Sequence, residues 1–477
     1  MSKKYIIGVD GGTQSSKVTI FDLEGRVVCE GKQSLKPMNL PMPGHVEHPD
    51  DDLWDSIVAA CRQAISSFPG NVNDILGLGL CTIRFCRVLL KEDGSLAHPV
   101  LSWMDERVSR PYEHKEESVR YVTSSSGYIT HRLTGRFVDT AASYQGQWPI
   151  DTDGWEWSGD AAVLKHYNLP REKLFELQMP GTILGYVTQQ ASQELGIPFH
   201  LPVIATANDK AVEALGAGLL DEKTGLVSLG TYIASMLHGS RNLTDKKNLW
   251  TNFAAIPGRY LYESHGIRRG MWTVSWFAQL LGDDITLKAN EIGVSPEGYL
   301  EREAVGVPPG CNGLMTVLDW LAPSEEPFKR GTMIGFNAYH TRAHIYRSIL
   351  EAAALTMKNR ADAMCAELGI TLERIILSGG GSKSDLMTEI FADVFGIPVI
   401  RNHVGDSAGL GSAICVAVSL GIYDSYESAV RNMVKVKDIR SPNEENYEFY
   451  KQMNEEVYQL VPSYTDPLYR KSYDVFG

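Results

Sequence analysis

One stretch of this 477-residue chain decides its fold: Gly8-Val9-Asp10-Gly11-Gly12-Thr13-Gln14-Ser15-Ser16-Lys17. The short β-type run Tyr5–Val9 leads into it and a second run, Lys17–Phe21, follows, so the stretch predicts a turn between two strands. Backbone N–H groups at the glycines can approach an anion, the hydroxyl groups can donate, and the carboxylate of Asp10 can hold Mg²⁺ directly or through water. The alternative is a tight hairpin whose glycines only supply positive φ.

The same plan occurs again later in the chain. Leu226–Leu229 and Ile233–Leu237 are short apolar runs that flank a turn at Gly230-Thr231. Segments 8–28 and 226–239 thus share an order of strand, Gly/Thr/Ser turn and strand, which predicts two structurally related halves. Paired turns of this kind can grip a polyphosphate. Neither G-x-x-x-x-G-K-[ST] nor a strand-linked G-x-G-x-x-G occurs, so the P-loop and dinucleotide-binding fingerprints are both absent.

Outside these turns, strands and helices alternate, which is typical of the α/β class. Hydrophobic spacing predicts further strands at 26–29, 75–83, 98–102, 203–207, 374–377 and 397–400. It predicts helices from about 50 onward and over 210–219, 343–368, 386–394, 407–420 and 447–460. Pro, Gly and Ser do not gather into a flexible linker, so we expect the two halves to pack closely.

Composition narrows the class of protein. The chain has 45 Lys+Arg against 58 Asp+Glu, a formal net charge of −13, which argues against nucleic acid or an anionic membrane as its main partner. No apolar run approaches the ~20 residues of a membrane span, and the N-terminal run ends at Asp10, unlike a signal peptide. The seven cysteines are scattered without a CxxC pair, so neither a disulfide framework nor structural zinc is expected. We therefore expect a reduced, cytoplasmic protein.

Polar residues at other strand ends are further candidates for a ligand pocket. Asp209 follows the predicted strand at 203–207, where it is either a general base or the N-cap of the next helix. Arg84 interrupts an apolar strand end, where it either binds a ligand or forms a salt bridge at the sheet edge. Trp103-Met104-Asp105-Glu106-Arg107 follows another predicted strand. Ser378–Ser382 places three glycines between a strand and a helix. These glycines either lie against a base or a phosphate of a ligand or form a plain turn.

Taken in order, these segments resemble the FGGY carbohydrate kinases of the actin/hexokinase-like superfamily, from Tyr5 to about Tyr423. The segments that carry the resemblance are Gly8–Lys17, Asn208–Gly218, Ser228–Tyr232, Ser378–Asp385 and Gly409–Ala417. Its most specific part is Gly331-Thr332-Met333-Ile334-Gly335-Phe336 followed by His344-Ile345 and Ser348-Ile349-Leu350-Glu351, a C-terminal family signature that departs only at Phe336. A smaller aliphatic residue is usual there.

The resemblance implies an architecture. It consists of two actin-like (ribonuclease H-like) domains, each a mixed sheet flanked by helices, with the active site in the cleft between them. We place the N-terminal domain, for sugar and Mg/phosphate binding, at 1–220 and the nucleotide-binding C-terminal domain at 221–477. The hinge is expected near Leu219–Thr224. A homodimer is compatible with this architecture.

The resemblance also implies ATP and Mg²⁺ as cofactors and a role for each matched residue. Asp209 matches the catalytic base beside the sugar hydroxyl, and Asp10 matches the acid that positions Mg²⁺ through water. The remaining matches are Gly12, Thr13, Gln14, Ser15, Gly230 and Thr231 at the phosphates, Gly380, Gly381 and Ser384 at the adenosine, and Arg84, Phe85 and Asp105 at the sugar.

The expected substrate is a small sugar. Glycerol kinases carry Arg-Glu and xylulose kinases Met-His where this chain has Arg84-Phe85, which puts both substrates in doubt. The Trp-Met-Asp-x-Arg run at 103–107 is closest to ribulokinase-like members, so a ketopentose is the first expectation. Between Arg107 and Tyr128–Gly135 the chain is shorter than in most members, which changes the pocket wall. A tetrulose, hexulose or alditol, or a catalytically weak regulator that binds nucleotide or sugar, are the alternatives.

Overall fold

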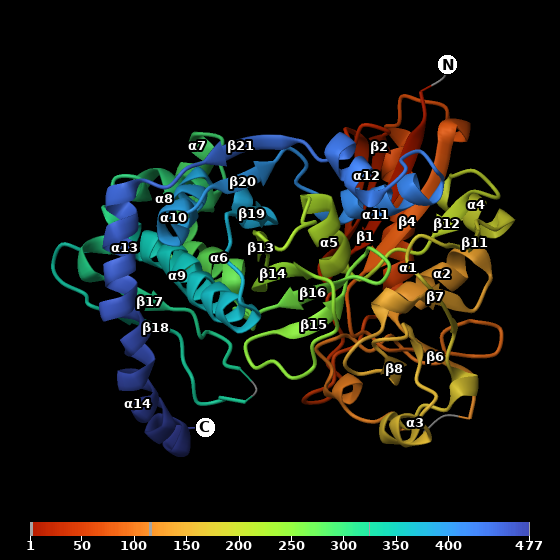
Figure 1. Ribbon diagram of the computed structural model, residues 1–477, viewed down its shortest axis with the longest axis horizontal. Coiled ribbons are helices and arrows are strands. Elements are labelled where there is room, and N and C mark those ends of the chain that lie inside the picture. The colour runs from red at the N-terminus through yellow and green to blue at the C-terminus, as the bar shows by residue number, and fades with distance from the viewer. Residues whose placement is uncertain (1–2, 114–116, 324, 477) are drawn as a thin grey trace.

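A computed structural model describes residues 3–113, 117–323 and 325–476 of the chain. It shows two halves side by side, each built on a mixed sheet with helices on its faces (Figure 1). The first half contains β1 (Tyr5–Gly11), β2 (Ser15–Asp22), β3 (Val27–Ser34), α1 (Asp52–Ser66), β4 (Ile75–Thr82), β5 (Val88–Leu90), β6 (Tyr121–Thr123), α2 (Ser125–Thr134), β7 (Val138–Thr140), β8 (Ile150–Asp151), β9 (Glu156–Trp157), α3 (Ala161–Tyr167), β10 (Glu176–Gln178), β11 (Ile183–Tyr186), α4 (Gln189–Leu195), β12 (Pro202–Ile204) and α5 (Asp209–Ala217).

The rest of the chain begins with β13 and forms most of the second half. Its elements are β13 (Thr224–Leu229), β14 (Ile233–Gly239), β15 (Trp250–Phe253), β16 (Tyr260–Glu263), α6 (Gly270–Leu280), α7 (Asp283–Glu291), α8 (Pro296–Ala304), β17 (Met315–Val317), β18 (Thr332–Ile334), α9 (Arg342–Leu368), β19 (Arg374–Ser378), α10 (Asp385–Phe395), β20 (Val399–Asn402), α11 (Ser407–Ser419), α12 (Tyr426–Met433), β21 (Val436–Arg440), α13 (Glu444–Glu456) and α14 (Val461–Phe476).

The two sheets repeat one plan. The first has the order β11-β12-β4-β1-β2-β3 and the second β15-β16-β14-β13-β19-β20-β21. In each, the first strand pairs antiparallel with the next strand of the chain and parallel with a later one: β1 with β2 and β4, β13 with β14 and β19. The predicted α/β fold of two related halves is therefore confirmed, and the two Gly-rich turns occupy equivalent places in it.

Local sequence explains the elements that carry the site. β1 is almost wholly buried, with Ile6 and Ile7 fully so, and Asp10 lies near the carboxyl end of this buried strand. α5 begins at Asp209 because the Asn208 side chain accepts a hydrogen bond from Ala211 N, which caps the helix. The helix ends at Gly218, whose φ of 91° suits glycine.

Helices α11 and α12 return to the first half. α11 packs against α5, β1 and β4, although it lies between two strands of the second sheet in the sequence (Figure 1). The packing is close enough to require glycines: a Cβ on Gly8 would lie 2.2 Å from the carbonyl oxygen of Gly409, and one on Gly216 would lie 1.9 Å from that of Ser407. Residues after 220 therefore do not all lie in the second half, and the chain passes between the halves near 402–407 and 433–436 as well as near 219–224.

A few predicted elements differ from the observed ones. Residues 98–102 do not form a strand, because Pro99 lacks an N–H and only Leu101 pairs, as isolated bridges with Glu47 and Arg87. The strand before Asp209 ends at Ile204. The helix expected at 447–460 is α13, and its fully buried Tyr450 donates a 2.7 Å hydrogen bond to Glu351 of α9. Within the ranges that the structure describes, no helix is long and apolar enough to cross a membrane.

Candidate active site

Acidic side chains from different elements converge at the cleft between the halves. Asp10 ends β1, Asp209 opens α5, Glu213 lies one turn along α5 and Asp406 precedes α11. Burial raises the pKa of Asp10 to about 8, and the charges of Asp406, Asp209 and Glu213 act in the same direction. Lys17 and Lys210 already pair with Asp406 and Glu213, so the charge that a bound cation would offset lies mainly at Asp10.

The donor set at Asp10 suits Mg²⁺. Across the residues that the structure describes, no group of three or more His, Cys, Asp or Glu side chains is arranged as a metal cage. Mg²⁺ does not need one, because it keeps several waters and takes one or two carboxylates together with substrate phosphates. Asp10 and its acidic neighbours fit that kind of site.

Asp209 is half-buried and accessible from the cleft. Its side chain is 28% exposed, and one carboxylate oxygen accepts a 2.9 Å hydrogen bond from Lys210 N. Burial raises its pKa above the usual range of an aspartate, although Arg84 and Lys210 oppose this shift. A carboxylate at a helix start that is partly open to the cleft can accept a proton from a bound hydroxyl group.

Arg84 lies beside Asp209 and spans the cleft. Its Nε is 3.5 Å from Asp209, and its two terminal nitrogens donate to Glu263 of β16 at 2.9 and 3.1 Å. The Trp250 ring lies against the guanidinium, with its centroid 4.9 Å from Cζ. Phe85 has a φ of 66°, a left-handed conformation that costs a non-glycine residue energy and is most often found at functional sites.

Asp105 is placed differently from the other predicted sugar residues. Its side chain is fully buried, and both carboxylate oxygens are engaged: Oδ1 accepts from the N and Nε of Arg107, and Oδ2 from Val46 N and Arg107 Nη2. With its acceptor positions filled, Asp105 holds Arg107 and has no open oxygen for a sugar. Arg107 also donates to Glu47 at 2.6 Å.

The two Gly/Thr turns have accessible residues. Gly12, Thr13 and Ser15 are partly exposed and Gln14 is exposed, and the turn is closed by a 3.1 Å bond from Gly12 N to Ser15 O. The second turn is joined to the start of α6, where Gly270 N and Met271 N donate to the carbonyls of Thr231 and Gly230.

The predicted adenosine loop lies directly against the second turn. A Cβ on Gly379 would lie 2.8 Å from Leu229 O, and one on Gly381 would lie 2.9 Å from the Cβ of Leu229, so Gly381 packs inward. Gly380 is exposed, with open space where a Cβ would be. The Ser384 hydroxyl accepts from Met387 N at 3.0 Å and caps α10.

Comparison with known proteins now decides the family. Residues 5–121 and 108–216 match the N-terminal domain of the FGGY family of carbohydrate kinases, and residues 225–420 match its C-terminal domain. The chain belongs to this family. It is therefore a carbohydrate kinase, and membership in a kinase family implies ATP as a substrate.

Relatives of known sequence or structure agree with this membership. The chain is 54% identical to "Uncharacterized sugar kinase YgcE" of Escherichia coli (strain K12), over 100% of this chain and 96% of that protein. It is 25% identical to an autoinducer-2 kinase of Photorhabdus laumondii over 95% of this chain and 93% of that protein. A xylulose kinase from Rhodospirillum rubrum has the same fold, with a TM-score of 0.82 and 22% identity, over 98% of this chain and 100% of that one.

Four residues of the matched segments form a hydrogen-bond network to which the sequence analysis gave no role. Lys210 donates to Glu213 at 2.8 Å and to Ser228 at 2.7 Å, and Glu213 also accepts from Ser228 and Ser378. This network ties α5 to the ends of β13 and β19. Sequence reasoning named the segments that contain these residues but missed the network, because local sequence does not show that the three elements meet. It also missed Glu263, although a charged residue that closes the apolar run 260–262 is the same signal that singled out Arg84.

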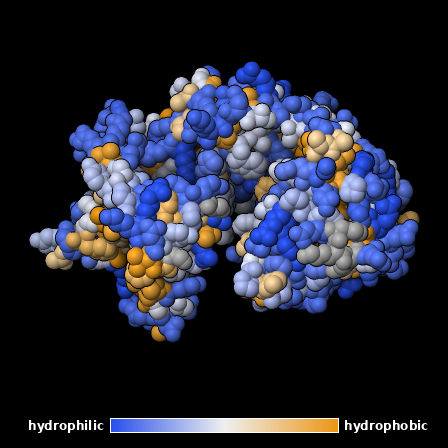
Figure 2. All heavy atoms as spheres, turned by 90° about the horizontal axis from the view of Figure 1, so that it is seen from below, coloured by the Kyte–Doolittle hydropathy of each residue, from blue (hydrophilic) through white to orange (hydrophobic). Residues whose placement is uncertain are grey.

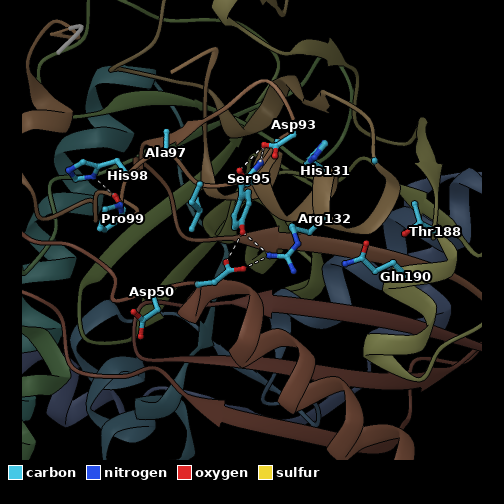
Figure 3. Close-up of a pocket in the computed structure, with 15 residues that line it drawn as sticks. Asp50, Asp93, Ser95, Ala97, His98, Pro99, His131, Arg132, Thr188 and Gln190 are labelled. Atoms are coloured by element: carbon cyan, nitrogen blue, oxygen red, sulfur yellow. Dashed lines mark hydrogen bonds and ion pairs between the residues drawn. The ribbon is translucent and has the colours of Figure 1, made fainter. Parts of the chain in front are cut away.

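The surface of this FGGY kinase has a hollow between the halves and a separate pocket elsewhere. Figure 2 shows a hollow between the two halves. A separate pocket of about 670 Å³ opens on the N-terminal half, where Arg132 and His131 of α2 face the 93–99 loop and Gln190 of α4 (Figure 3). In this pocket Arg132 forms an ion pair with Asp51, and this pair includes none of the predicted catalytic residues. None of those residues lines this pocket, so it is distinct from the cleft.

Proposed function

We propose that the protein transfers the γ-phosphoryl group of ATP to a hydroxyl group of a small sugar, a ketopentose first of all, with Asp209 as general base. The observation that supports the proposal is the position of Asp209 beside Arg84, close enough to Asp10 for its charge to act there, with the next residue, Lys210, bonded to Ser228 ahead of the second turn. The turns supply N–H and hydroxyl donors for phosphates, and Arg84 and Asp209 supply a donor and an acceptor for vicinal hydroxyl groups.

The reaction follows from this arrangement. The sugar hydroxyl, held by Arg84 and Asp209, attacks the γ-phosphorus in line with the leaving ADP oxygen. The new O–P bond forms while the bond to the β,γ-bridging oxygen breaks, ADP leaves, and the hydroxyl proton passes to Asp209. Mg²⁺ bound near Asp10 would neutralise phosphate charge. Because phosphoryl transfer requires mainly positioning and charge neutralisation, a carboxylate suffices as the base.

Support for a ketopentose comes from the sugar side of the cleft. Phe85 stands where glycerol kinases carry a glutamate and xylulose kinases a histidine. The run Trp103–Arg107 is similar to the corresponding run of ribulokinase-like members. Tetruloses, hexuloses and alditols share the vicinal hydroxyl groups that Arg84 and Asp209 would bind, so all of them belong in the assay.

We also propose that the enzyme acts in the cytoplasm as a homodimer. Free cysteines, all seven buried, suit a reducing compartment. Tyr464, Leu468, Val475 and Phe476 of α14 are largely exposed, and Figure 2 shows apolar side chains gathered on the C-terminal half. A second copy covering them would remove this apolar surface from water. Light scattering that reports only a monomer of 52.8 kDa would contradict the dimer.

The test is ADP release from Mg-ATP with a panel of ketopentoses, tetruloses, hexuloses and alditols, for the wild type and for Asp209→Asn. The amide is nearly isosteric but cannot accept the proton, so turnover should fall ~10²-fold or more while ATP binding persists. Full turnover by the variant would remove Asp209 from the mechanism. Silence of the wild type across the panel, with ATP still bound, would favour the regulator alternative.

A further inference from the structure

Arg84 is already paired before any sugar arrives. Its guanidinium donates to both carboxylate oxygens of Glu263, which is 1% exposed, and this pair joins the segment that follows β4 in the first half to β16 of the second. The side chain of Arg84 is itself only 13% exposed. Nothing in the mechanism above uses Glu263.

The C-terminal half presents Glu263 together with Trp250. β15 and β16 are antiparallel, and Trp250 is the direct partner of Glu263 in their register, so both side chains leave the same face of the ribbon. Trp250 covers the guanidinium at 4.9 Å and approaches Phe85, with the ring centroids 6.4 Å apart. These two side chains thus form the wall that the second half contributes beside Asp209.

The charge of Glu263 changes what Arg84 can recognise. An arginine with a free planar fork binds a carboxylate or phosphate through two parallel hydrogen bonds. Here Glu263 occupies that fork, and Asp209 lies 3.5 Å from the remaining Nε. The local charge of Arg84, Glu263 and Asp209 together is negative, so an anionic sugar would meet repulsion where an uncharged polyol would meet donors and acceptors.

We infer that Glu263 is a specificity-determining residue that neutralises Arg84 and thereby restricts the sugar site to uncharged polyhydroxy compounds, with sugar acids excluded. The inference rests on the proposed function, because it concerns the acceptor of the same phosphoryl transfer. Discrimination of this kind operates by repulsion against the wrong substrate as well as by contacts with the right one.

The experiment compares matched acceptors in the wild type and in Glu263→Gln. Kcat/KM is measured by ADP release for the neutral ketose or alditol that the wild type uses and for the aldonate of the same carbon number. Glutamine keeps one hydrogen bond to Arg84 but removes the charge, so the ratio of neutral to aldonate kcat/KM should fall ~10-fold or more. KM for ATP should be little changed, because Glu263 is bonded to Arg84 of the proposed sugar site.

A matched control is available in the same half. Glu303 of α8 receives a two-bond fork from Arg342 at 2.7 and 2.6 Å, away from the cleft residues. Glu303→Gln removes the same charge from the same kind of pair and should leave the acceptor ratio unchanged. An equal change in both variants, or an unchanged ratio in Glu263→Gln, would show that Glu263 only holds the halves together.

The wild type alone supplies a second test that does not depend on the folding of a variant. It should phosphorylate the neutral acceptor with a far higher kcat/KM than the aldonate, and the aldonate should be only a weak competitive inhibitor. A wild type that uses the aldonate as well as the ketose would overturn the specificity role while the kinase proposal stands. A wild type that phosphorylates no member of the panel would overturn the proposed function, and the role of Glu263 with it.

Discussion

Arg84 links catalysis to cohesion of the two halves through a single side chain. Its guanidinium lies between Asp209 and Glu263 and beneath the Trp250 ring, so it is bound by both halves at once. A buried charge is stable only when paired, and removal of one partner leaves the other without compensation. A change at this residue is therefore expected to act on the proposed sugar binding and on stability together.

For Arg84→Ala we expect a higher KM for the sugar, by ~10-fold or more, with KM for ATP little changed. The variant should also lose about 3–5 kcal/mol of stability, because Glu263 is left buried and unpaired. Initial-rate kinetics and denaturant unfolding measure the two effects. Arg342→Ala, which breaks the fork to Glu303 outside the cleft, is the control for general loss of a pair. A loss of ATP affinity at Arg84 instead would move this residue to the nucleotide side.

At the scale of elements, the interface of α5 and α11 depends on small residues. Gly216 of α5 faces Ser407 O at the start of α11, and Gly411 of α11 faces Val212 O, with no room for a side chain at either contact. Asp209 is the first residue of α5, and Asp406 directly precedes α11. The spacing of the two helices therefore sets the distance between these two acids of the cleft.

Gly216→Ala should therefore destabilise the protein. The added Cβ would lie 1.9 Å from a backbone oxygen, and overpacking of this kind typically costs about 1–3 kcal/mol. Thermal or denaturant unfolding measures the loss. Gly159→Ala is the control, since nothing lies within 4 Å of its added Cβ. Equal stability of the two variants would contradict the close packing of the two helices.

Elements differed in how far local sequence could predict them. The strand–turn–strand at 5–21 and helix α9 are specified by near-neighbour patterns, and the predicted bounds of both agree with the structure to within a few residues. Residues 98–102 look like a strand by composition, but a strand needs a partner, and only Leu101 finds one. Asp10, Thr13 and Asp209 could be proposed as site residues because each belongs to a recognisable turn or strand end. Glu263 carried only the signal of a charge that closes an apolar run, and Trp250 carried none, since their contact with Arg84 joins positions far apart in the sequence.

The whole molecule is tied together by more than its cleft. Asp406 accepts a 2.7 Å hydrogen bond from Thr19 of β2, so the loop before α11 is anchored in the first sheet. The buried α11 residues Leu410, Ile414 and Val416 belong to the same core cluster as Ile204 and Val212 of the first half. No pattern within the 407–433 segment indicates which sheet it will cover, because both sheets offer apolar faces. Its place follows from the glycine contacts with β1, β4 and α5.

The first half should consequently not fold as residues 1–220 alone. That fragment lacks α11, so the apolar face of β1, β4 and α5 would be open to water. We expect it to aggregate or to show no cooperative thermal transition by circular dichroism. The rescue is a single chain in which residue 218 is joined through a short Gly/Ser linker to residues 403–434. The join is short because Asn402 Nδ2 donates to Ala217 O at 2.9 Å, so the two ends lie side by side. Cooperative unfolding of the rescued chain but not of 1–220 would establish that the first half is built from two separate stretches of sequence. An independently folded 1–220 fragment would show instead that α11 is an accessory layer, and the glycine contacts at Gly8 and Gly216 would then matter for closure of the halves and not for folding.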